Sequence, residues 1–99
     1  MKKAAELLAE AGELITDSRR YLSEFGSVDP DSLCRRIDAW RNDMAIAGAA
    51  KGKNAPKLGG GLTPVQWLRQ MATMDRKRDA HFRAMEADAI ADWLEGRKP

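Results

Sequence analysis

Two side chains with nucleophilic or metal-binding chemistry, Cys34 and His81, each occur once in this chain of 99 residues. A cysteine is activated for catalysis when an imidazole lies within hydrogen-bond reach and a third group orients it. A metal site needs several convergent His, Cys or carboxylate ligands. Near His81, only Asp75 and Asp79 share one helical face. We therefore expect no catalytic residue, no metal and no cofactor, and we interpret Cys34 as a small core residue.

A glycine- and lysine-rich stretch, residues 51–62, precedes Thr63 and Pro64. Helix N-termini present free amide hydrogens and the positive end of the helix dipole, so a loop at this place can bind an anion. The stretch differs from the phosphate-binding pattern GxxxxGK[ST], and no strand precedes it. Two interpretations stay open: a flexible linker, which the composition favours, and a site for a small anionic ligand or nucleotide at the glycines before Thr63.

Positive charge is concentrated in residues 51–83, although the chain carries a net charge of only +2. Residues 1–50 hold seven Lys/Arg and nine Asp/Glu, a net of −2, whereas residues 51–99 hold ten and six, a net of +4. Such a cluster can attract an acidic partner or phosphate groups. Nucleic-acid binding is therefore an alternative function. Its candidate residues are Lys51, Lys53, Lys57, Arg69, Arg76 and Lys77.

The last third of the chain carries an aromatic and methionine-rich face whose members recur at alternating spacings of four and three. Aromatic and arginine side chains dominate binding hot spots, and methionine adapts to irregular surfaces. We expect Trp67 and Met71 to lie in the core. The expected partner-binding residues are Arg78, Phe82, Met85, Trp93 and Leu94, with Tyr21 and Phe25 as a second face.

Helices must position these residues, because apolar residues recur with helical spacing in three segments and no alternating strand pattern occurs. The predicted helices span about 3–25, 30–50 and 64–94, and residues 51–62 form a flexible loop. The fold class is therefore all-α, in one domain over 1–99. We expect either a three-helix bundle or a helical hairpin followed by a long C-terminal helix.

The predicted helix ends rest on capping residues. Gly26 follows the first apolar stripe, where a left-handed C-terminal cap is expected. Asp29 is an N-cap, and Pro30 fits the first helical position because its missing amide hydrogen is not needed there. Thr63 and Gln66 have the spacing of a capping box at the start of the third helix.

The third predicted helix is long for a domain of this size, since a helix of about 30 residues spans roughly 45 Å. The polar run at 75–79 interrupts its apolar character. Part of this helix is expected to project, to kink or to pack on another chain. We therefore expect self-association into a homo-oligomer.

These features indicate a non-catalytic, cytoplasmic protein that acts stoichiometrically on a protein partner, as an adaptor, inhibitor or accessory subunit. No apolar run approaches the roughly 18 residues of a membrane span. A single cysteine is typical of a reducing compartment. Small helical proteins of this kind are common products of mobile genetic elements, which is one source that we expect.

Overall fold

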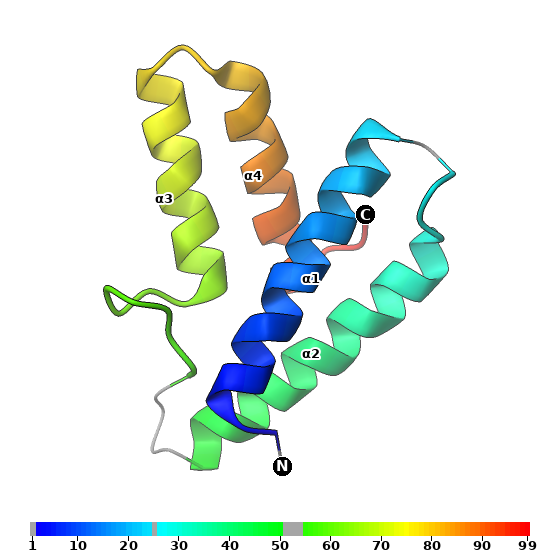
Figure 1. The fold of residues 1–99 in the computed structure, drawn as a ribbon, viewed down its shortest axis with the longest axis vertical. Helices are drawn as coiled ribbons and strands as arrows, with labels where there is room; N and C mark the ends of the chain where they lie inside the picture. The colour runs from blue at the N-terminus through cyan, green and yellow to red at the C-terminus, as the bar shows by residue number, and fades with distance from the viewer. Residues whose placement is uncertain (1, 25, 51–54) are drawn as a thin grey trace.

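The fold, known from a computed structural model that describes residues 2–24, 26–50 and 55–99, consists of four α-helices (Figure 1). Their bounds are α1 Ala4–Ser23, α2 Pro30–Ala50, α3 Pro64–Lys77 and α4 His81–Glu95. No strand occurs in these three ranges, so the all-α prediction is confirmed. Within them, none of the helices combines the length and the apolar composition that a membrane span requires. Phe25, Lys51 and Lys53 lie outside the described residues.

Both predicted N-terminal caps are present. The Oδ2 atom of Asp29 accepts a hydrogen bond of 3.1 Å from the backbone amide of Ser32 at the start of α2. At α3, the Thr63 hydroxyl accepts from the Gln66 amide at 3.3 Å, and the Gln66 side chain accepts from the Thr63 amide at 3.0 Å. These bonds satisfy amide hydrogens that the first helical turn leaves free, so the local sequence sets both helix starts.

The prediction of one helix over 64–94 is wrong, because the chain reverses at Asp79. This residue adopts a left-handed conformation with φ of 60°. Its amide donates to the carbonyl of Arg76 at 3.2 Å, and the Ala80 amide donates to the carbonyl of Asp75 at 2.8 Å. This pair of bonds is a Schellman motif, which usually places glycine at the left-handed position. Aspartate tolerates that conformation better than most residues, so the helix ends here.

The four helices form two hairpins, α1 with α2 and α3 with α4 (Figure 1). In the second hairpin α4 runs antiparallel to α3, and α4 also contacts both α1 and α2. The single long third helix of the predicted bundle is therefore replaced by a pair, and α4 lies at the centre of the fold.

Small side chains allow α4 to take this central place. Ala84, Ala87 and Ala91 are all at most 4% exposed, and Ile90 is fully buried. Alanine lets a neighbouring helix approach closely, whereas larger residues from the other helices fill the remaining core volume. Those larger core residues include Leu7, Leu14, Leu33, Ile37, Trp40 and Leu68.

Two aromatic contacts connect the helices. The indole nitrogen of Trp40 on α2 donates a buried hydrogen bond of 2.9 Å to the carbonyl of Leu7 on α1. Tyr21 on α1 meets Trp93 on α4 edge to face, with ring centroids 5.8 Å apart and an interplanar angle of 72°. Trp93 and Leu94 are 8% and 2% exposed. Their expected place on a partner-binding surface is therefore corrected: the reversal at Asp79 folds them into the core.

Asp79→Gly is expected to raise the free energy of unfolding by about 1 kcal/mol, because glycine adopts the left-handed conformation without the steric cost that aspartate carries. The Asp79 carboxylate lies 3.7 Å from the His81 ring and both side chains are largely exposed, so loss of this contact costs little. Urea denaturation measures the change. Asp79→Ala is the control, since alanine keeps the steric cost. Equal stability of the two variants would contradict the assignment of this turn.

Candidate partner-binding groove

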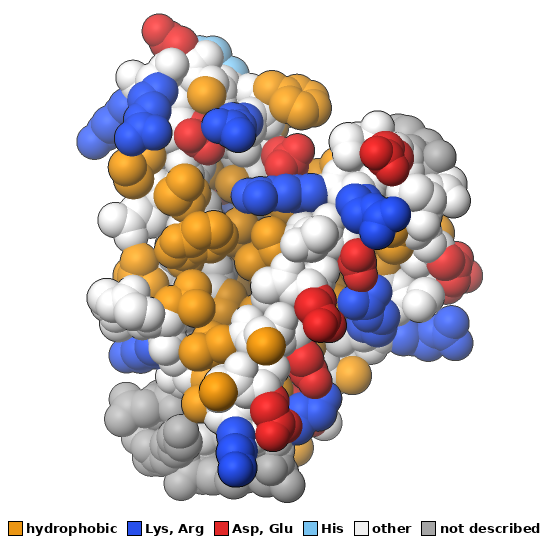
Figure 2. All heavy atoms as spheres, viewed as in Figure 1, with side chains coloured by type: hydrophobic (Ala, Val, Ile, Leu, Met, Phe, Trp, Pro, Cys, Tyr) orange, Lys and Arg blue, Asp and Glu red, His pale blue; other side chains and the backbone are white. Residues whose placement is uncertain are grey.

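An open groove lined by apolar residues lies between α1 and α3 (Figure 2). It has a volume of about 320 Å³. We call this hollow the apolar groove; its lining residues are Leu8, Ala11, Gly12 and Ile15 of α1, Leu58 of the loop, and Pro64 and Trp67 of α3. The groove exists because α3 packs chiefly on α4, whereas α1 packs on α2 and α4. Apolar faces of α1 and α3 are thereby left facing one another across open space.

A second hollow of about 610 Å³ continues from the apolar groove toward the α3–α4 turn, and Trp67 lines both. We call it the basic end. Its other lining residues are Arg19, Ser23, Met71, Asp75, Arg78, Phe82, Arg83, Glu86 and Ala87. Arg19 on α1 pairs with Glu86 on α4 at 3.1 Å. Arg78 and Arg83, by contrast, are exposed and form no ion pair with any described residue.

Trp67 lies where the two hollows meet and is only half-buried. Its indole nitrogen donates to no residue that the structure describes, whereas the indole of Trp40 is hydrogen-bonded inside the core. A half-buried tryptophan that lines a groove with its apolar face and keeps a free donor is typical of an interface anchor. Trp67 and Met71 were expected in the core, and the structure leaves both partly exposed.

Two apolar residues of the expected partner-binding set are largely exposed. Phe82 is 74% exposed and Met85 is 69% exposed, near the start of α4. Arg78 is exposed beside them at the end of α3. Tyr21, from the second expected face, is half-buried against Trp93. The structure therefore brings Arg78 and Phe82 together at the basic end and separates them from Tyr21.

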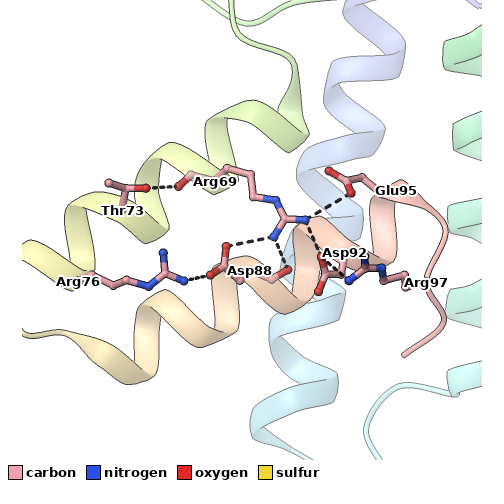
Figure 3. A network of polar contacts seen from close by, with 7 residues as sticks. All are labelled: Arg69, Thr73, Arg76, Asp88, Asp92, Glu95 and Arg97. Carbon is pink, nitrogen blue, oxygen red and sulfur yellow. Dashed lines mark hydrogen bonds and ion pairs between the residues drawn. The ribbon is translucent and has the colours of Figure 1, made fainter.

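An ion cluster occupies the outer face of the second hairpin and joins its two helices (Figure 3). The guanidinium of Arg69 on α3 contacts the carboxylates of Asp88 at 3.2 Å, Asp92 at 2.5 Å and Glu95 at 3.4 Å, all on α4. The hydrogen bond that Arg69 donates to the Asp92 carboxylate raises the pKa of Arg69 above its ordinary value. Because the neighbouring carboxylates favour the charged form, Arg69 stays positive throughout the pH range in which proteins are studied.

The residues expected to bind nucleic acid have different surroundings. Arg69 belongs to the ion cluster, and Arg76 pairs with Asp88 (Figure 3). Lys57 and Lys77 are exposed and unpaired within the part of the chain that the structure describes. Intramolecular pairing thus reduces the basic surface that the sequence suggested: two of the four described members of the expected set, Arg69 and Arg76, are paired with carboxylates.

The glycine-rich loop closes on itself where it is described. The amide of Leu58 donates to the carbonyl of Leu62 at 2.8 Å, and the amide of Gly61 donates to the carbonyl of Leu58 at 3.1 Å. Gly60 and Gly61 have φ of 88° and 78°, which glycine adopts without strain. With the first turn of α3 capped by Thr63, fewer amides are free to bind an anion, which favours a linker over an anion site for the described part of this loop.

Cys34 and His81 lie in different surroundings. His81 is exposed at the start of α4, with its Nε2 atom 3.7 Å from Asp79. Cys34 is half-buried on α2 and faces a small hollow shared with Ile37 and Gly96. Among the residues described, no three His, Cys, Asp or Glu side chains converge on one point.

Sequence reasoning missed the apolar groove itself. The signal that could have found it is the breadth of the apolar surface on α1, where Leu7 and Leu8 follow one another. Leu7 is fully buried, whereas Leu8 is half-exposed and lines the groove. An apolar face wider than one neighbouring helix can cover indicates a second contact surface.

Comparison with the models of known protein families, with curated proteins and with solved structures found no match to this chain. The site must therefore be interpreted from its own geometry.

A double-mutant cycle with Arg69→Met and Asp92→Asn is expected to give a coupling energy of about 1 kcal/mol between these two side chains. The coupling decreases at high salt because the pair is partly exposed. Urea denaturation of the four proteins measures it. The exposed pair Asp38–Arg41, with its charged atoms 3.9 Å apart, is the matched control and is expected to give coupling near zero. Equal coupling for both pairs would contradict a stabilising role for the ion cluster.

Proposed function

We propose that this chain is a non-catalytic protein-binding module that acts stoichiometrically, as an adaptor, inhibitor or accessory subunit, and that its partner occupies the apolar groove. One observation carries the proposal: the half-exposed Trp67 lies in a groove of apolar side chains that the chain's own helices leave uncovered. Contiguous apolar surface of this kind marks an interaction site. The free thiol of Cys34 is consistent with a cytoplasmic location.

Gly12 offers a direct test, because it lines the groove and a Cβ atom built there meets nothing within 4 Å. Gly12→Gln is expected to obstruct the groove while leaving the helix intact. The probe is a display library of helix-forming segments of 14 residues, the length of α3. Segments selected by the native protein are expected to shift its tryptophan fluorescence, because Trp67 lines the groove. Gly12→Gln is expected to weaken their binding at least about tenfold, a loss that corresponds to about 1.4 kcal/mol.

Gly12→Ala is the matched control. Its small side chain leaves the groove open and is expected to raise the free energy of unfolding by about 0.5–1 kcal/mol, because alanine is the better helix former. It should bind the selected segments as the native protein does. Undiminished binding by Gly12→Gln would place the partner elsewhere.

Self-association is a further proposal, which the exposed Phe82 and Met85 support. These side chains lie on α4 close to the turn, where two copies can meet without opening either core. Trp93, which was also expected on a binding surface, is buried, so Trp93→Asp is instead expected to unfold the chain.

Light scattering of the native protein is expected to give twice the mass of one chain, and Phe82→Asp is expected to give a monomer with unchanged helical circular dichroism. Phe82→Leu, which keeps an apolar side chain, is the control and should remain a dimer. A native protein that is monomeric at high concentration would contradict self-association.

Nucleic-acid binding is the second candidate function. It is supported by the exposed Phe82, on which a base can stack, and by the unpaired cations Arg78 and Arg83, which line the same hollow. Lys77 is a further exposed and unpaired cation at the end of α3. Addition of single-stranded DNA to the light-scattering experiment tests it, with Lys77→Glu as the variant expected to weaken binding. Binding that survives high salt would count against recognition of phosphates. A nucleotide or small anion at the glycine-rich loop is a third and weaker candidate, because the loop amides described above are already bonded.

A further inference from the structure

We infer that the segment bound in the apolar groove is an acidic amphipathic α-helix of about four turns, whose apolar stripe covers Trp67 and whose carboxylates meet Arg78 and Arg83 at the basic end. This inference rests on the proposed function and specifies the chemistry of the partner.

The shape and lining of the groove select a helix. Two helices form its walls, and α3, with 14 residues, is about 21 Å long, which is the length of a partner helix of the same size. The apolar groove offers no charged side chain from its lining residues. An extended segment buried there would leave backbone hydrogen-bonding groups without partners, whereas a helix satisfies its own.

The charges at the basic end select acidic residues. Three guanidinium groups line it, and Arg19 is already paired with Glu86. The other acid in its lining is Asp75, which is 9% exposed. Arg78 and Arg83 are exposed and unpaired within the described residues, so partner carboxylates would gain ion pairs where partner cations would be repelled.

A second copy of the chain does not supply such a helix. The large apolar side chains that are exposed in the described residues are Ile46, Met74, Phe82 and Met85. They are distributed over α2, α3 and α4, with one or two on each, so none of these helices presents an exposed apolar stripe. A copy would have to open its own core to fill the groove, which favours a partner of different sequence.

The experiment determines the amino-acid composition of the segments selected from the display library, and then measures the affinity of one of them by fluorescence anisotropy. We expect apolar residues at helical spacing and an excess of Asp and Glu over the unselected library. The variant R78E/R83E is expected to lose at least about tenfold in affinity for the selected segment, and to regain it for the same segment with Lys in place of Glu.

R35E/K98E is the matched control: it makes the same change in net charge at two exposed and unpaired cations that line neither hollow. It should bind within about twofold of the native protein, since charges remote from the site act weakly at physiological salt. If circular dichroism shows that R78E/R83E is unfolded, the single variants R78Q and R83Q are measured instead. Each is expected to lose about threefold in affinity for the selected segment.

The outcomes separate this inference from the proposed function. Selected segments with an apolar stripe but no acidic excess, or unchanged affinity for R78E/R83E, overturn the acidic partner while the groove remains the binding site. Extended or proline-rich segments overturn the helix. If Gly12→Gln abolishes self-association and the selected segment competes with it, the groove is assigned to a second copy of the chain. If single-stranded DNA displaces the segment, the basic end is assigned to nucleic acid. No selected segment at all overturns both the inference and the proposed function.

Discussion

The left-handed turn at Asp79 is the constraint on which the rest of this fold depends. It divides one amphipathic stretch into α3 and α4, and the amides of Asp79 and Ala80 close the end of α3 onto its own carbonyls. Without this reversal, a helix of about 30 residues would extend roughly 45 Å, beyond the reach of α1 and α2. With it, Ile90 and Leu94 return to the first hairpin and complete the core.

The same reversal creates the apolar groove. Because α4 occupies the space next to α1 and α2, α3 packs chiefly on α4, to which Arg69 also binds through the ion cluster (Figure 3). One part of the apolar face of α3 is thereby buried, as Leu68 and Ala72 are, and the other part, with Trp67, stays open. The groove is thus a consequence of how the hairpin is joined.

Local signals in the sequence were sufficient for the starts of α2 and α3 and for the fold class. Asp29 and Thr63 cap helices as predicted, because a cap depends on residues within one turn. The turn at Asp79 was missed for the opposite reason: the stripe continues through it at helical spacing, and aspartate is not the residue expected in a left-handed cap. Burial of Trp93 and exposure of Trp67 follow from that turn, so neither could be predicted without it.

Charge counting along the sequence overestimates the basic surface, since it treats every cation in residues 51–83 as available. In the fold, the carboxylates of α4 lie opposite the cations of α3, so Arg69 and Arg76 are neutralised within the hairpin. The cations left at the basic end, Arg78 and Arg83, lie next to apolar side chains and not along an extended stripe. A polyanion is bound best by cations distributed along its backbone, whereas two cations at the end of an apolar groove suit a short amphipathic segment. The distribution of charge and the shape of the groove therefore favour the same class of partner.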